Sequence, residues 1–262
     1  MQPLTETVSS FGSLPDGSAD TERPAAPVSR DLSLLGLVEV LLKDPQRLDD
    51  LNRDEARQAE LMPRFLAISL ASFALFGVAL AMILHFTPAA AYPHRVLAVP
   101  RANLADGSGL ALVLAYSLGL VAATGLCLPS FYFFSLLAGV RMRLSQIVSQ
   151  VMCSKATTAV VLVGILPIYV AVVLGLVVFE ADAQLLETCL YLGLALPFVA
   201  GLAGVRALYR GVSAMAETMP PERRCRRACF FRRLTVSWAA CYTAVSPVLI
   251  YRLWETLAPA LA

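Results

Sequence analysis

Five long apolar stretches, each without a charged residue between its flanks, divide this chain. They cover approximately residues 65–86, 109–139, 157–179, 188–205 and 234–251. A helix needs about 20 apolar residues to cross the hydrocarbon core of a bilayer, and each stretch is near or above that length. The pattern predicts an all-α, polytopic membrane protein with five transmembrane helices within residues 63–258. The fifth stretch is the most polar and also fits an interfacial or re-entrant segment, but its length favours a full crossing.

Composition agrees with a membrane protein. Hydrophobic residues make up 58% of the chain and charged residues 15%, against about 25% charged in a soluble domain. Residues 1–30 are rich in Ser, Pro, Gly and Asp, which predicts a disordered cytoplasmic tail. This tail lacks the apolar core of a signal peptide. We therefore expect the first apolar stretch to act as an uncleaved signal-anchor.

The loops between the stretches alternate between rich and poor in basic residues. Arg and Lys are frequent before the first stretch, between the second and third, and between the fourth and fifth. Basic loops stay on the cytoplasmic side, so the N-terminus is predicted to be cytoplasmic and the C-terminus outside. Lys155 is assigned to the second basic loop, together with Arg141 and Arg143. The excess of Arg over Lys is typical of a high-GC genome and favours a bacterial inner membrane.

Residues 31–62, ahead of the first stretch, are predicted to form amphipathic helices. Asp31 is a candidate N-cap for a helix with an apolar face, and Asp44 followed by Pro45 is a typical start of a second helix. The face of the first helix comprises Leu34, Leu35, Val38, Leu41 and Leu42, and the second helix carries Leu48, Leu51 and Leu61. Two interpretations are open: an interfacial helix that binds the membrane, or cytoplasmic helices that dock on the bundle or on a partner. The mixture of acidic and basic residues favours docking.

Four of the stretches contain a proline, namely Pro129, Pro167, Pro197 and Pro247. Each is predicted to kink its helix, because proline removes a backbone hydrogen bond and crowds the preceding turn. The kinks could be hinges around a substrate site, as in transporters, or could only shape a packed bundle. Small residues such as Gly119 and Gly204 fit close helix packing. With Lys155 placed in a loop, the stretches contain no Asp, Glu, Lys or Arg away from their ends, which favours packing over transport.

The densest positive charge precedes the fifth stretch. Its six arginines are Arg223, Arg224, Arg226, Arg227, Arg232 and Arg233. Each arginine near an anionic lipid surface contributes about 1 kcal/mol of attraction. The run is a candidate site for anionic lipid or an acidic protein partner, and it also serves as a topology determinant. We do not expect nucleic acid as a partner beside a membrane span.

The sequence offers no catalytic or metal-binding motif. Cys225 and Cys229 lie four residues apart and Cys153 is assigned to a cytoplasmic loop, but zinc sites usually need four Cys or His ligands. The histidines, His85 and His94, fall on the predicted outer side. Walker, HExxH and dinucleotide-binding motifs are absent. We therefore expect neither a metal nor a cofactor, and no enzymatic activity.

The architecture resembles that of the Yip1-like membrane proteins. The likeness rests on five spans punctuated by Gly and Pro behind a cytoplasmic region with a disordered start, and it covers roughly residues 31–251. The Asp-Leu-Tyr-Gly-Pro signature of that family is absent. The resemblance implies a non-enzymatic adaptor that binds partners or lipids. From the residues alone we expect a membrane scaffold or accessory subunit, with a protein partner or a second copy bound. The alternative is a transporter or channel for an uncharged or lipidic substrate.

Overall fold

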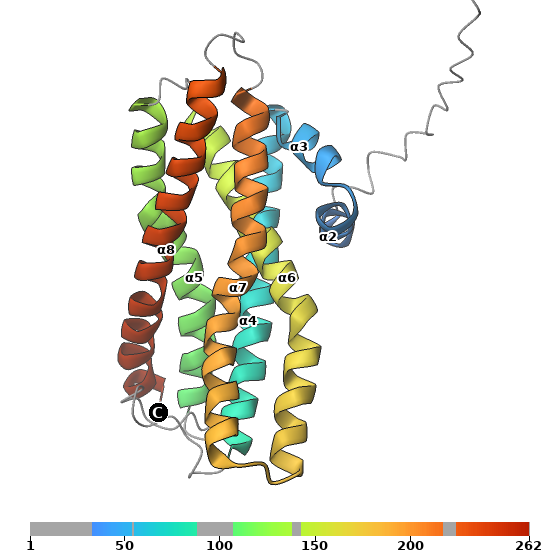
Figure 1. The fold of residues 1–262 in the computed structure, drawn as a ribbon, viewed down its shortest axis with the longest axis vertical. Coiled ribbons are helices and arrows are strands. Elements are labelled where there is room, and N and C mark those ends of the chain that lie inside the picture. The colour runs from blue at the N-terminus through green and yellow to red at the C-terminus, as the bar shows by residue number, and fades with distance from the viewer. Residues whose placement is uncertain (1–32, 54, 88–106, 138–142, 217–223, 262) are drawn as a thin grey trace, which may run out of the picture.

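The computed structural model describes residues 33–53, 55–87, 107–137, 143–216 and 224–261, which form helices and no strands (Figure 1). Two short helices, α2 (Leu34–Lys43) and α3 (Pro45–Arg53), precede five long ones. The long helices are α4 (Glu55–Phe86), α5 (Ser108–Leu137), α6 (Leu144–Val178), α7 (Ala183–Ala216) and α8 (Arg224–Leu261). All five long helices are long and apolar enough to cross a membrane, as predicted. The chain is therefore an integral, multi-pass membrane protein.

The long helices form an up-and-down bundle whose members follow the order α8, α5, α4, α6, α7 around a ring. The most extensive contacts join α5 to α8, α4 to α6, α6 to α7 and α4 to α5. The ring closes between α7 and α8, which touch less than the other neighbours. These two helices are also the least apolar of the five candidate spans.

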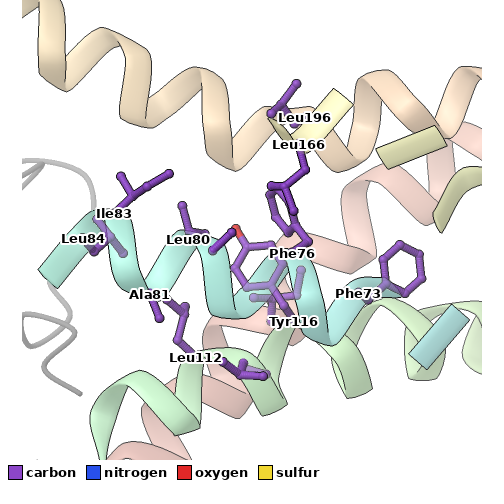
Figure 2. Close-up of a cluster of buried hydrophobic side chains, with 14 of the residues drawn as sticks. Phe73, Phe76, Leu80, Ala81, Ile83, Leu84, Leu112, Tyr116, Leu166 and Leu196 are labelled. Atoms are coloured by element: carbon purple, nitrogen blue, oxygen red, sulfur yellow. The ribbon is translucent and has the colours of Figure 1, made fainter. Parts of the chain in front are cut away.

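The main core fills the half of the bundle farthest from α2 and α3. In Figure 2, Phe76 of α4 lies beside Tyr116 of α5, and their ring centroids are 5.5 Å apart in an edge-to-face arrangement. Leu80 and Leu112 are buried in the same cluster. Close helix contact accompanies this packing, because a Cβ atom on Gly119 of α5 would lie 2.8 Å from the side-chain atom Cγ1 and 3.3 Å from the backbone atom Cα of Ile250 on α8. The predicted role of Gly119 in close helix packing is confirmed.

The helices extend well beyond the predicted apolar stretches, and this overturns one assignment. Helix α6 contains 35 residues and begins at Leu144 rather than near 157. Its first turn is closed by Gln146, whose side chain accepts a hydrogen bond from the Arg143 N–H (3.2 Å). Ile147 and Val151, one turn apart, are both fully buried. Lys155 and Cys153 therefore lie inside a packed helix, and their assignment to a loop was wrong.

Helices α2 and α3 pack against the side of the bundle near one end, and we call this pair the platform (residues 34–53). Figure 1 shows α2 nearly end-on, so its axis runs across the long axis of the bundle. The start of α3 at Pro45 is confirmed, with Asp44 Oδ1 accepting from the Arg47 N–H (3.1 Å). The predicted cap of α2 is wrong: Ser33 caps this helix by accepting from the Gly36 N–H (3.0 Å). Asp31 lies outside the described residues, as does the tail 1–30.

Candidate functional site

The platform half of α6 carries a row of polar side chains that are all buried. They are Ser149, Gln150, Ser154, Lys155 and Thr158. Different members face different neighbours: the Ser149 hydroxyl donates to Asn52 Oδ1 of α3, and the Ser154 hydroxyl donates to the Gly204 carbonyl of α7 (2.7 Å). A buried polar group is costly unless it is hydrogen-bonded. These bonds tie α6 to both neighbours.

Lys155 is the buried charge in this row, with a residual exposure of 5%. Its ammonium nitrogen lies 3.0 Å from the ring centroid of Tyr242 and 5.4 Å from that of Trp238, both on α8. Because α6 and α8 are not neighbours in the ring, this side chain reaches across the interior of the bundle. Among the residues that the structure describes, it has no carboxylate partner.

The two aromatic rings are held in place by α5. Trp238 and Tyr242 stack with centroids 5.8 Å apart and an interplanar angle of 21°. The Trp238 indole N–H donates to the Cys127 carbonyl (3.2 Å), and the Tyr242 hydroxyl donates to the Leu120 carbonyl (3.2 Å). The edges of the rings are thus anchored, and a ring face remains for the ammonium group.

A cation over desolvated aromatic rings gains about 2 kcal/mol or more. Burying an ammonium group costs several kcal/mol, so the rings offset only part of that cost. An ionisable residue inside a membrane bundle is a functional-site hypothesis by default. The sequence argument against transport depended on Lys155 lying in a loop, whereas the structure buries this residue inside the bundle. The helical spacing of Ile147 and Val151 was the signal in the sequence that α6 starts early enough to include it.

Two cysteines face each other near this site. Cys127 Sγ and Cys241 Sγ lie 3.9 Å apart, between α5 and α8. Within the described ranges, no group of three or more His, Cys, Asp or Glu side chains could hold a metal. Cys225 and Cys229 both lie on α8, but their side chains are outside what the structure describes.

The platform is fixed to α4 and α6 by an apolar cluster that includes Leu37, Leu48, Leu61, Phe65 and Ala156. Gln58 Nε2 of α4 also donates to the Asn52 carbonyl (2.8 Å). The platform therefore packs on the bundle, and its place on the cytoplasmic side stays a prediction. The predicted apolar face of α2 is partly wrong, because Leu41 is buried whereas Leu34, Leu35 and Leu42 are exposed.

The structure describes only part of the arginine run. Arg223 lies outside the described residues, and Arg224, Arg226 and Arg227 lie on α8 with side chains that are not described. Arg232 and Arg233 are exposed on α8. Their predicted role in binding lipid or a partner stays a prediction.

All four predicted prolines lie inside continuous helices, with Pro129 in α5, Pro167 in α6, Pro197 in α7 and Pro247 in α8. Helices α4 and α8 contain one further proline each, Pro63 and Pro259. Pro247 lines a cavity of about 290 Å³ between α7 and α8. The predicted kinks stay predictions.

Comparison of the chain with protein-family models, with curated proteins and with solved structures finds no match.

Proposed function

We propose that this protein is a non-enzymatic membrane scaffold or accessory subunit that recruits a protein partner through the platform. This proposal rests on the platform, which is packed onto the bundle while part of its apolar surface stays exposed. Leu35 is 84% exposed and Leu42 is 62% exposed. They lie seven residues apart and so share one face of α2.

The exposed side of α2 is not purely apolar, and this supports a protein partner over lipid. Lys43 Nζ lies 2.7 Å from Glu39 Oε1 on the exposed surface. This hydrogen bond and the charge of Lys43 lower the pKa of Glu39. A helix that inserts into an anionic lipid surface is usually biased toward basic residues on its polar face. An apolar stripe next to a neutralised ion pair is suited to a protein surface.

The arginine run at the start of α8 is the proposed site for anionic lipid. We propose that this run binds lipid headgroups on the same side of the membrane as the platform, which is the cytoplasmic side in the predicted topology. The architectural resemblance to the Yip1-like proteins supports the same role, and the absence of enzymatic activity is part of the proposal.

Site-specific photo-crosslinking in cells tests this function. A photoreactive amino acid replaces Leu35 and, as the control, Val199, which is 51% exposed on α7 within a candidate span. We expect a discrete protein adduct from position 35 and lipid adducts from position 199. Lipid adducts alone from position 35 would overturn recruitment through the platform.

A transporter for an uncharged or lipidic substrate is the second candidate, favoured by the buried charge of Lys155 and the cavity beside Pro247. The proline variants Pro129→Ala and Pro197→Ala separate the two functions. In a scaffold they change stability or assembly, because the crossing geometry of the helices changes. In a transporter they leave both unchanged and lock one conformational state. We expect the first outcome, measured as thermal stability in detergent and partner co-purification.

A further inference from the structure

The cavity beside Pro247 lies at the seam of the ring, by which we mean the contact between α7 and α8, the least extensive contact between ring neighbours. Helices α7 and α8 diverge enough to leave about 290 Å³ between them, with Tyr191 and Phe198 on one wall and Pro247 and Tyr251 on the other. Tyr116 of α5 and Trp254 of α8 also line it. Ligand sites in proteins measure about 300–1,000 Å³. At about 290 Å³ the cavity is just below that range, which suits a short segment of a flexible chain rather than a bulky headgroup.

One residue that lines this cavity carries a buried hydrogen-bond donor without an acceptor. Trp254 is only 3% exposed, and its indole N–H has no partner among the described residues. The other tryptophan, Trp238, is equally well buried but donates to the Cys127 carbonyl (3.2 Å). Buried polar groups are nearly always paired. The N–H itself faces no open space in this structure, so an occupant of the cavity that Trp254 lines supplies the missing acceptor when the indole ring turns toward it.

The surroundings of the cavity favour a lipid over a water-soluble ligand. None of the lining residues is charged. Next to it, Val199 of α7 and Val248 of α8 are more than half exposed, at 51% and 62%. Both helices are candidate spans, so these surfaces face the bilayer. An occupant would enter sideways from the hydrocarbon, between two helices that touch little.

The depth of the donor indicates which part of a lipid it meets. Trp254 lies seven residues before the end of α8 at Leu261, or about 10 Å along the axis. Trp and Tyr gather at the membrane interface, and the ester carbonyls of glycerolipids lie at the same level. An acyl chain that extends from there toward the bilayer centre would pass Ile250 and Pro247.

We propose that the cleft between α7 and α8 binds one acyl chain of a glycerolipid, whose ester carbonyl accepts a hydrogen bond from the Trp254 indole N–H. Tyr191 does not compete for this carbonyl, because its hydroxyl donates to Glu187 Oε1 (3.2 Å). The site does not depend on recruitment through the platform, which lies at the other end of the bundle.

Photo-crosslinking with a phospholipid that carries a diazirine in one acyl chain tests the site. The purified full-length protein is reconstituted in vesicles of that lipid, and the labelled peptides are mapped. Ala195→Phe should fill the cleft, since Ala195 lines it. Val172→Phe is the control, because Val172 is 51% exposed on α6, a helix that contributes no residue to the lining of the cavity. We expect the label on α7 and α8 to fall at least about fivefold in Ala195→Phe, and to stay unchanged in Val172→Phe.

A second variant tests the hydrogen bond without filling space. Trp254→Phe removes the N–H and keeps an aromatic ring, and one hydrogen bond corresponds to about a 2- to 10-fold change in binding. This loss is expected for an ester-linked photolipid and not for its ether-linked analogue, which has no carbonyl. Equal labelling of the wild type, Ala195→Phe and Val172→Phe would show that the lipid is only an ordinary annular contact, and would overturn the proposed site. If Ala195→Phe does not fold, the test is the effect of Trp254→Phe on labelling by the ester-linked and by the ether-linked photolipid. An equal effect on both lipids would overturn the proposal.

Discussion

Replacing Gly204 by Ala should loosen the contact between α6 and α7. A Cβ atom at this position of α7 would overlap Thr158 Oγ1 and would lie 2.7 Å from the Ser154 carbonyl oxygen. The carbonyl belongs to the backbone of α6 and cannot move away as a side chain would. The two helices must therefore separate, which also weakens the hydrogen bond from the Ser154 hydroxyl to the Gly204 carbonyl (2.7 Å).

The expected loss follows from these two effects. Overpacking costs about 1–3 kcal/mol, and a hydrogen bond between membrane helices contributes about 0.6 kcal/mol on average, with a maximum near 1.7. Gly201→Ala is the matched control, because a Cβ atom there would meet no other atom within 4 Å. Both variants gain the same helix propensity. We therefore expect Gly204→Ala to be about 2–4 kcal/mol less stable than Gly201→Ala.

Equilibrium unfolding in mixed micelles with increasing SDS, followed by circular dichroism, measures this difference. Thr158→Ala combined with Gly204→Ala should recover part of the loss, because it removes the overlapping hydroxyl. Stabilities of Gly204→Ala and Gly201→Ala that agree within about 0.5 kcal/mol would refute the tight α6–α7 contact described above.

Three further predictions concern charge and topology. Lys155→Met should leave the free energy of unfolding equal or higher, because the cost of burying an ammonium group exceeds what the rings return; a loss above about 2 kcal/mol in the same SDS titration would assign Lys155 a stabilising role. Replacing four arginines of the run by Gln should weaken binding to anionic liposomes in a flotation assay, whereas replacing them by Lys should preserve it; the four are Arg223, Arg224, Arg226 and Arg227. An equal loss with Gln and with Lys would indicate bidentate recognition of an acidic partner. Cys225 should react with a membrane-impermeant maleimide only after the cells are opened, and labelling of intact cells would reverse the predicted topology.

The number and type of helices could be predicted from the sequence, because a span of about 20 apolar residues is a strong signal that needs no knowledge of neighbours. The ends of the helices could not. Lys155 was used to end a span, yet α6 continues through it to Leu144, since Trp238 and Tyr242 shield the charge. These rings are more than 80 positions away in the chain, and only the fold brings them to α6.

In the candidate sites, too, local features could be predicted from the sequence, whereas features set by tertiary contacts could not. The docking of α2 and α3 was predictable from their mixed charges. The orientation of α2 was not, because this helix has leucines on several faces and the contact with the bundle selects Leu37 and Leu41 over Leu35 and Leu42. The cavity beside Trp254 is set by the spacing of α7 and α8, a tertiary property that leaves no mark on the local sequence.

The unequal apolar lengths of the helices have a consequence for the surrounding bilayer. The apolar stretches of α5 and α6, residues 109–137 and 157–178, are about 43 and 33 Å long, whereas those of α7 and α8, residues 188–205 and 234–251, are about 27 Å long. A typical hydrocarbon core is about 30 Å thick, and each ångström of mismatch costs a fraction of a kcal/mol. Lipids beside α5 and α6 must stretch or these helices must tilt, while lipids beside α7 and α8 are compressed. The protein thus imposes a gradient of bilayer thickness around its own circumference, with the thin side at the seam where its ring is least tightly closed.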